Sequence, residues 1–299
     1  MRRALAATPR ALTPLALLAA ALALVLPSGF VAARSDLLLA LLVLATALGI
    51  SFADLRRLRD HARAVGVLSI VPLVVLGAGA WVLGRPFAPP IRDGLLAVGL
   101  ASSEVASVGL VALARADATV ALGAVSGSLV ASAVLGPLAI GALAGGSTHA
   151  DPLPLLGRFA LVVIVPLVVG VAARSGWPRS QVADPEREGI AALVVAVLVY
   201  AALSGTHGTH HLAAALLASV AFLAVSAVAG ELWRRRAADS ATAVPGALAI
   251  AMRDFAVAAA LATQAFGTRA GAVPGVYGVV MLVAGTVAAG RLARGSTRT

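Results

Sequence analysis

Long apolar runs, separated by short polar or basic stretches, recur along the whole chain. Runs near 18 residues or longer can cross the hydrocarbon core of a bilayer as helices. They are continuous rather than alternating, which favours helices over the strands of a membrane barrel. The pattern predicts an all-α membrane protein with ten transmembrane helices, at Leu12–Val31, Leu37–Ser51, Val65–Leu83, Leu95–Leu113, Thr119–Leu143, Leu155–Ala173, Gly189–Leu203, His211–Trp233, Ala243–Phe266 and Ala270–Leu292.

Two of these segments, the fourth and the ninth, carry charged residues at their centres. A carboxylate near the middle of a bilayer costs roughly 3 kcal/mol on insertion scales, so it must face a bundle interior, a partner or water. We therefore predict that the rest of the chain brings these two segments together. Their candidate binding residues are Ser102, Ser103, Glu104 and Ser107 in the fourth segment, and Arg253 and Asp254 in the ninth.

In a regular helix, Ser103, Glu104 and Ser107 would share one face. Two hydroxyls and a carboxylate form an oxygen-rich spot suited to a hard cation, a proton or a polar substrate. The alternative for the serines is hydrogen bonding to the carbonyls of their own helix. Glu104 has no such alternative, because a carboxylate cannot donate to a carbonyl and, when buried, requires a partner or a proton.

Arg253 and Asp254 are neighbours, so on a helix they would point about 100° apart. Either the helix is unwound there, or the two residues face different helices; Pro245 and Gly246 make a bent entry plausible. We predict that Arg253 pairs with Glu104 or Asp254, which leaves one carboxylate as a candidate proton carrier. The alternative is an ion pair with a purely structural role. An aqueous cavity reaching Glu104 and Arg253 would favour transport.

Composition agrees with a single membrane domain. The chain is 60% hydrophobic and 12% charged, far from the roughly 25% charged residues of soluble proteins. The net charge of +10 comes from arginine clusters between apolar segments, so nucleic acid is not an expected partner. The absence of cysteine excludes disulfides and thiolate metal sites.

The arginines also predict orientation. With both termini on one side, that side holds 17 of the 23 arginines and the other side holds 5, while Arg253 lies inside a segment. The bias predicts that both termini lie in the cytoplasm, and it supports an even number of spans. The membrane is expected to be a bacterial inner membrane. The N-terminal segment also resembles a secretory signal with a tolerable cleavage site at Phe30–Ala33, although retention as a first helix is the favoured reading.

Ten spans divide into two halves of five, residues 1–146 and 147–299, with a polar breakpoint at 145–152. An odd-numbered repeat must insert upside down relative to its copy, which gives inverted topology. The charged segments are then the fourth of each half. Interrupted helices at matching places in two halves are the best sequence indication of a transporter's binding site.

Other polar groups carry weaker signals. His207, His210 and His211 have no acidic neighbour, so no metal site is predicted from them. Arg115 and Asp117 are expected to form a solvated pair in a turn, and Arg234–Arg236 an interfacial anchor. No nucleophile–base or metal-ligand grouping appears, so no catalytic residues, and no enzyme, are predicted.

Five short motifs, in this order, resemble the bile acid:sodium symporter family. They are Ala47-Leu48-Gly49-Ile50-Ser51, Asp54-Leu55-Arg56-Arg57-Leu58, Leu113-Ala114-Arg115-Ala116-Asp117, Met252 with Ala258–Ala262, and Ala272-Val273-Pro274-Gly275. The resemblance implies two inverted five-helix repeats with broken, crossing fourth and ninth helices. It also implies a core of the third to fifth and eighth to tenth helices, a panel of the others, and sodium-coupled uptake of organic anions by alternating access. Met252 joins the six polar residues as a candidate binding residue.

The sequence departs from that family where side-chain oxygens would hold sodium. The positions concerned are occupied here by Pro72, Val108, Ala121, Val125, Ala249, Arg253 and Asp254. This argues against sodium coupling. Our hypothesis is that Arg253 replaces sodium as a fixed charge and that Glu104 or Asp254 carries a proton.

The sequence therefore predicts a secondary active transporter of small organic anions. A proton-coupled exporter or facilitator of the same fold is the nearest alternative, and a non-transporting membrane sensor or assembly protein is the alternative from another class. Partners are an organic anion and the lipid bilayer, and no cofactor is expected beyond sodium or a proton as coupling ion. The substrate, the direction of transport and the oligomeric state stay open.

Overall fold

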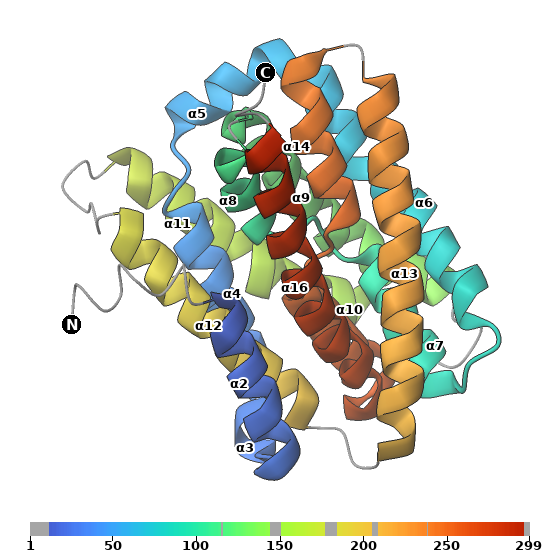
Figure 1. Ribbon diagram of the computed structural model, residues 1–299. Coiled ribbons are helices and arrows are strands. Elements are labelled where there is room, and N and C mark those ends of the chain that lie inside the picture. The colour runs from blue at the N-terminus through green and yellow to red at the C-terminus, as the bar shows by residue number, and fades with distance from the viewer. Residues whose placement is uncertain are drawn as a thin grey trace.

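The protein is an all-helical bundle (Figure 1). The computed structural model describes residues 12–114, 116–143, 151–176, 184–204, 209–237 and 239–295. Within these ranges no strand forms, apart from one isolated antiparallel bridge between Ser103 and Arg253. The fold class predicted from hydropathy is therefore confirmed at the level of an all-α protein.

The described helices run as follows. In the N-terminal half they are α2 (Leu12–Val25), α3 (Gly29–Ala32), α4 (Ser35–Ala47), α5 (Phe52–Arg57), the 3-10 helix η2 (Leu58–His61), α6 (Ala62–Gly84), α7 (Pro89–Leu100), α8 (Ala106–Leu113) and α9 (Ala118–Leu143). In the C-terminal half they are α10 (Pro152–Phe159), the π-helical turn η3 (Ala160–Ile164), α11 (Val165–Gly176), α12 (Asp184–Ser204), α13 (Thr209–Arg236), α14 (Ser240–Ala251), α15 (Phe255–Phe266), the 3-10 turn η4 (Thr268–Gly271) and α16 (Ala272–Gly295).

Five helical stretches of the described residues are long and apolar enough to cross a membrane. They are Phe52–Gly84, Ala118–Leu143, Pro152–Gly176, Leu212–Arg236 and Thr268–Ala288, and five shorter apolar helices accompany them. The chain is therefore a multi-pass membrane protein. Each of the ten predicted segments contains helix, but the first does not continue to Val31. It is interrupted after α2 at Pro27, because proline lacks the N–H and clashes with the preceding turn of a helix.

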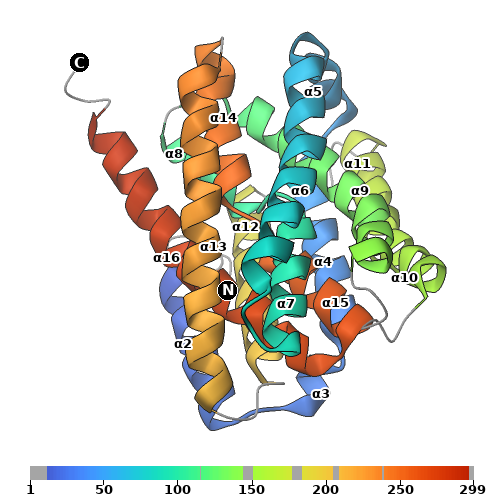
Figure 2. The same ribbon diagram turned by 90° about the vertical axis from the view of Figure 1, so that its right-hand side faces the viewer.

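The interior is built largely from small residues, whereas large aliphatic side chains cover the outside. Val74, Leu161 and Leu217 are each more than half exposed, as expected for positions that face lipid. By contrast, α15 is buried on nearly every side, and its run Ala258–Ala262 is at most 4% exposed. A helix that is apolar all round is stable only when other helices enclose it, and Figure 2 shows α15 among α4, α7 and α16.

Glycine allows the tightest of these helix contacts. A Cβ added at Gly99 of α7 would lie 2.6 Å from the carbonyl oxygen of Leu76 and from the Cβ of Ala80, both in α6. Small residues let helix backbones approach closely, and in lipid such packing replaces the hydrophobic effect as the source of helix association. The pair α6–α7 is therefore held in one register just before α7 ends.

Candidate substrate site at two interrupted helices

Both charged segments are interrupted helices. α7 ends at Leu100, Ala101 is extended with φ −71° and ψ 163°, and helix resumes only at Ala106. α14 ends at Ala251, Met252 is extended with φ −111° and ψ 115°, and α15 starts at Phe255. Of the two alternatives for Arg253 and Asp254, the unwound helix is thus the one present. Pro245 lies within the continuous α14 rather than at the break.

The common face that Ser103, Glu104 and Ser107 would share in a regular helix does not form, because the fourth segment is interrupted. Ser103 and Glu104 lie in the extended break, and only Ser107 belongs to a helix, the first turn of α8. A shared face requires unbroken i, i+3 and i+4 spacing, which holds only while the backbone stays helical.

The two breaks cross each other as a short antiparallel bridge. The backbone N–H of Glu104 donates to the carbonyl of Met252 at 3.0 Å, and the N–H of Asp254 donates to the carbonyl of Ser102 at 2.8 Å. Unwound backbone inside a membrane protein must find such partners, because lipid offers none. Each break therefore satisfies the other, and the two interrupted helices form one structural unit.

The charged side chains lie at helix ends of opposite polarity. Asp254 caps α15, since its Oδ1 accepts the N–H groups of Ala256 and Val257 at 2.9 and 3.0 Å. Glu104 Oε1 accepts the N–H of Ala106, the first residue of α8, at 3.4 Å. Arg253 donates through Nη2 to the carbonyl of Ala101, directly after α7. The positive N-terminal ends thus meet carboxylates and the negative C-terminal end meets a guanidinium.

The predicted ion pair of Arg253 is not formed. Within the described residues no carboxylate lies within 4.0 Å of its guanidinium, and the side chain hydrogen-bonds to a backbone carbonyl instead. Helix ends take the place of the predicted ion pair, because their free backbone groups are partners for buried charges. The position of these helix ends could not be predicted from the sequence. Asp254 nevertheless lies near enough to interact electrostatically with both Glu104 and Arg253.

Several buried polar atoms of this site have no hydrogen-bond partner among the described residues. The hydroxyls of Ser102, Ser103 and Ser107 do not donate to carbonyls of their own helix, the alternative considered for them. Other hydroxyls of the bundle, such as those of Ser126 and Thr263, do bond in that way. Buried polar groups are almost always paired, so such a cluster points to a place that binds polar ligands. The atoms are Ser102 Oγ, Ser103 Oγ, Ser107 Oγ, Glu104 Oε2, Arg253 Nε and Arg253 Nη1.

Three neighbouring helices hold the crossing in place. In α9, Ser128 Oγ accepts the N–H of Ser103 at 2.9 Å, and Ser132 Oγ donates to the carbonyl of Leu100 at 2.7 Å. In α16, the hydroxyl of Tyr277 accepts the N–H of Arg253 at 3.0 Å. In α13, Ser226 Oγ donates to the carbonyl of Ala251 at 3.0 Å. Sequence analysis did not identify these four supporting residues. Each appears in the sequence only as a hydroxyl side chain inside an apolar segment.

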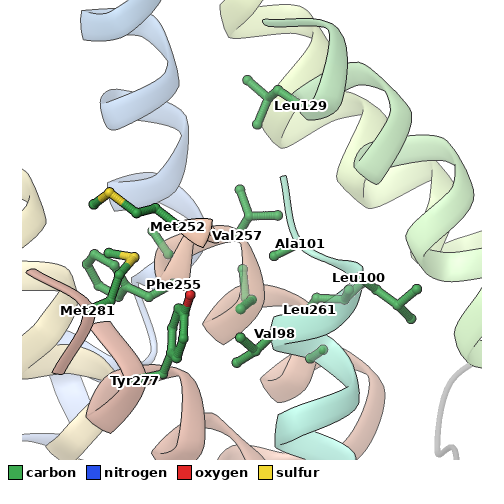
Figure 3. Close-up of a cluster of buried hydrophobic side chains, with 14 of the residues drawn as sticks. Val98, Leu100, Ala101, Leu129, Met252, Phe255, Val257, Leu261, Tyr277 and Met281 are labelled. Atoms are coloured by element: carbon green, nitrogen blue, oxygen red, sulfur yellow. The ribbon is translucent and has the colours of Figure 1, made fainter. Parts of the chain in front are cut away.

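Apolar side chains surround the crossing on several sides. Figure 3 shows Met252, Phe255 and Met281 grouped together above Tyr277, with Val257 next to Ala101. The site is closed to the outside, since Glu104 is 1% and Arg253 0% exposed. The two described cavities, of about 780 and 660 Å³, are lined by other residues. The candidate residues are thus brought together in an enclosed site that no ion pair locks.

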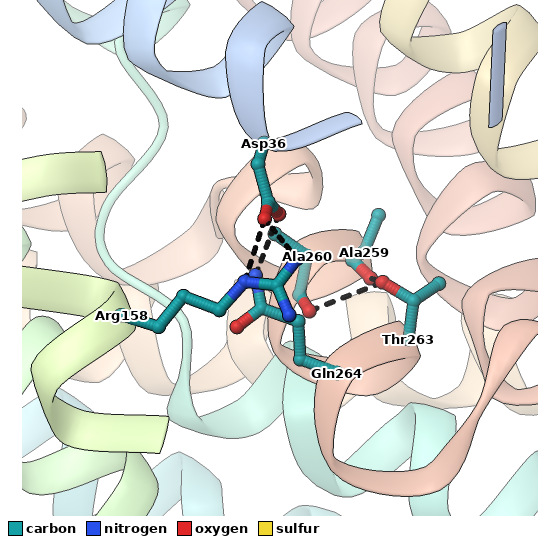
Figure 4. Close-up of polar contacts among 6 residues, drawn as sticks. All are labelled: Asp36, Arg158, Ala259, Ala260, Thr263 and Gln264. Atoms are coloured by element: carbon teal, nitrogen blue, oxygen red, sulfur yellow. Dashed lines mark hydrogen bonds and ion pairs between the residues drawn. The ribbon is translucent and has the colours of Figure 1, made fainter. Parts of the chain in front are cut away.

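A second polar cluster, which is partly exposed, links three helices away from the crossing (Figure 4). Asp36 of α4 accepts from Arg158 Nε of α10 at 2.7 Å and from Gln264 Nε2 of α15 at 2.6 Å. Gln264 Oε1 is buried without a partner. Sequence analysis did not single out these residues, because each stands near the end of its own apolar segment.

The remaining candidates fall partly outside the described residues. Arg115, His207 and most of the breakpoint at 145–152 lie outside, and the side chains of His210 and His211 are not described. Asp117 Oδ1 accepts the N–H of Thr119 at 2.8 Å at the start of α9. At the end of α13, Arg234 and Arg235 both pair with Glu231 at 2.7 Å.

The fold and this site define a class, a multi-pass helical membrane protein with two interrupted helices that cross inside the bundle. Residues 36–220 match the model of the sodium bile acid symporter family, well over half of the chain. The protein belongs to this family, as its motifs predicted. The match includes the first interrupted helix and ends before the second. No curated protein matches the chain.

Proposed function

We propose that the protein is a secondary active transporter of small organic anions that works by alternating access. The observation that carries the proposal is the antiparallel bridge between Ser103 and Arg253, which joins two interrupted helices at their charged centres. Paired helix ends and unwound backbone are typical of substrate and ion sites in transporters. Family membership supports transport as the general activity.

We propose ten spans in two inverted repeats, with both termini in the cytoplasm and the protein in the inner membrane. The correspondence of packing partners supports this. α7 packs on α6 and α16, and at the matching place in the second half α14 packs on α13 and α9. Both half-helices have 12 residues. The antiparallel sense of the bridge also agrees with two segments that cross the membrane in opposite directions.

Arg253 acts in this proposal as a fixed positive charge in place of a bound sodium ion. Its guanidinium reaches the carbonyl of Ala101 at the negative end of α7, a position at which a cation would also be held. Two of its nitrogens have no partner in the described part of the chain and are available to an anionic substrate.

Glu104 is the better candidate for the proton carrier. Asp254 Oδ1 is committed to two backbone N–H groups of α15, whereas Glu104 Oε2 has no partner. A proton on Oε2 of Glu104 therefore leaves the bond from the N–H of Ala106 to Oε1 in place. We expect Glu104→Gln to uncouple transport from the proton gradient, and Asp254→Asn to retain coupling.

The test is uptake into proteoliposomes of a labelled bile acid and of labelled small monocarboxylates, under sodium and proton gradients separately. We expect uptake driven by the proton gradient alone. Arg253→Glu should abolish it, and a fully active Arg253→Glu variant would reject the role of Arg253. Uptake that follows concentration alone would instead indicate a facilitator. No uptake of any anion under either gradient would favour a non-transporting protein.

Alternating access also requires contacts that break when the two bundles move. Asp36 and Arg158 belong to helices of the proposed panel, and Gln264 to the proposed core, so their cluster links the two. A cysteine at Ser103 would be the only thiol and would report opening of the site by maleimide labelling. We expect Gln264→Ala to raise the labelling rate. Thr263→Val is the control, because Thr263 bonds only to carbonyls of its own helix.

A further inference from the structure

A groove unrelated to the crossing lies between α6, α13 and α14. It has a volume of about 780 Å³, within the range of small-molecule binding sites. In Figure 2, α6 and α13 run side by side on the face toward the viewer. The apolar walls include Val67, Val71, Val75 and Leu232, whose side chains are 36–55% exposed. These positions face outward, so the groove opens toward lipid.

The mouth of the groove carries both signs of charge. Arg63 and Arg236 contribute two cations, and Asp60 and Asp239 two carboxylates. Among the described residues none of the four forms an ion pair, although Asp239 caps α14 through the N–H of Ala241. Guanidinium groups recognise phosphate by charge-assisted hydrogen bonds, and carboxylates recognise an ammonium group.

Trp233 marks the level of the mouth. Its indole N–H donates to the carbonyl of Thr242 at 3.1 Å and so ties α13 to α14. The ring lies against Gly246, where any side chain would collide with the indole. Tryptophan is enriched where the hydrocarbon core meets the headgroups, so the charges beside it lie at headgroup depth.

The length of the groove fits one leaflet. Arg63 and Val75 are 12 residues apart on α6, which corresponds to about 18 Å at 1.5 Å per residue. Half of a hydrocarbon core measures about 15 Å. The apolar floor ends near Ile250, two residues before the break at Met252.

We propose that this groove is a specific binding site for one phospholipid with a zwitterionic phosphoethanolamine headgroup. The phosphate lies between Arg63 and Arg236, the ammonium group near Asp60, and an acyl chain along Val67, Val71 and Val75. Because α14 forms one wall, the bound lipid also supports the half-helix that leads to the crossing. The proposal rests on the groove and on the membrane location of the chain, not on transport.

Native mass spectrometry of the purified full chain tests the site. The protein in detergent is titrated with dioleoylphosphatidylethanolamine or with dioleoylphosphatidylglycerol. We expect one tightly bound phosphatidylethanolamine per chain, and its loss in Val71→Trp, which fills the groove. Val74→Trp is the matched control, since Val74 is 57% exposed on the same helix but does not line the groove. Loss of the lipid in both variants, or in neither, would overturn the site.

The headgroup assignment is tested separately. Arg63→Gln should weaken binding about tenfold or more, as expected for loss of a charge-assisted hydrogen bond. Arg59→Gln, which removes a nearby arginine outside the groove, should leave affinity unchanged. Asp60→Asn should reduce the preference for phosphatidylethanolamine. Equal affinity for phosphatidylglycerol in the unaltered protein would refute the zwitterionic headgroup. A dimer that Val71→Trp dissociates would assign the groove to a second copy of the chain instead.

Discussion

The cap that Asp254 provides to α15 yields the sharpest energetic prediction. Asp254→Ala removes the acceptor of two backbone N–H groups, those of Ala256 and Val257, in a residue only 2% exposed. Asp254→Asn removes the charge but keeps a side-chain oxygen for the cap. Because both variants are neutral at this position, the difference between them isolates the cap from the cost of burying a charge.

The expected magnitude follows from the geometry. A buried N–H left without a partner costs about 1–3 kcal/mol. With two of them unpaired, Asp254→Ala should be less stable than Asp254→Asn by about 2–6 kcal/mol. Asp239 caps α14 through one N–H on an exposed residue. The same comparison at Asp239 should therefore give only about 0.5–1 kcal/mol.

The measurement is the free energy of unfolding, obtained by titrating each variant in dodecylmaltoside micelles with dodecyl sulfate and following tryptophan fluorescence. Stabilities of Asp254→Ala and Asp254→Asn that agree within about 0.5 kcal/mol would refute the argument, because one unpaired buried N–H alone should exceed this value. A larger cost at Asp239 than at Asp254 would contradict the assumed role of burial.

Two further predictions concern the elements that hold the crossing. Ser128→Ala leaves the buried N–H of Ser103 without its acceptor and should cost about 1–3 kcal/mol of unfolding free energy, whereas Ser126→Ala, which loses only a bond to its own helix, should cost far less. Equal losses would mean that Ser128 does not support the break. Gly99→Ala forces α7 away from Leu76 of α6 and should cost about 1–3 kcal/mol. Gly109→Ala meets nothing within 4 Å and should be neutral or stabilising, so a thermal unfolding midpoint lowered equally by both would contradict close packing at Gly99.

Much of this protein could be read from the order of its residues. Apolar runs long enough for a bilayer determine that the chain is a helical membrane protein, because lipid accepts backbone only when it is hydrogen-bonded internally. The high cost of charge in hydrocarbon singled out Glu104, Arg253 and Asp254, and the motif order identified the family. These signals are local, so one sequence carries them.

What the tertiary structure decided is which groups meet. The sequence favoured an ion pair for Arg253, but the guanidinium takes the carbonyl of Ala101 and the carboxylates take the N-terminal ends of α8 and α15. The helix ends come within reach of these side chains only when the two interrupted helices cross. The local sequence does not determine which distant backbone groups will lie nearby. The supports from Ser128 and Tyr277, and the cluster around Asp36, likewise arise from contacts between residues far apart in the chain.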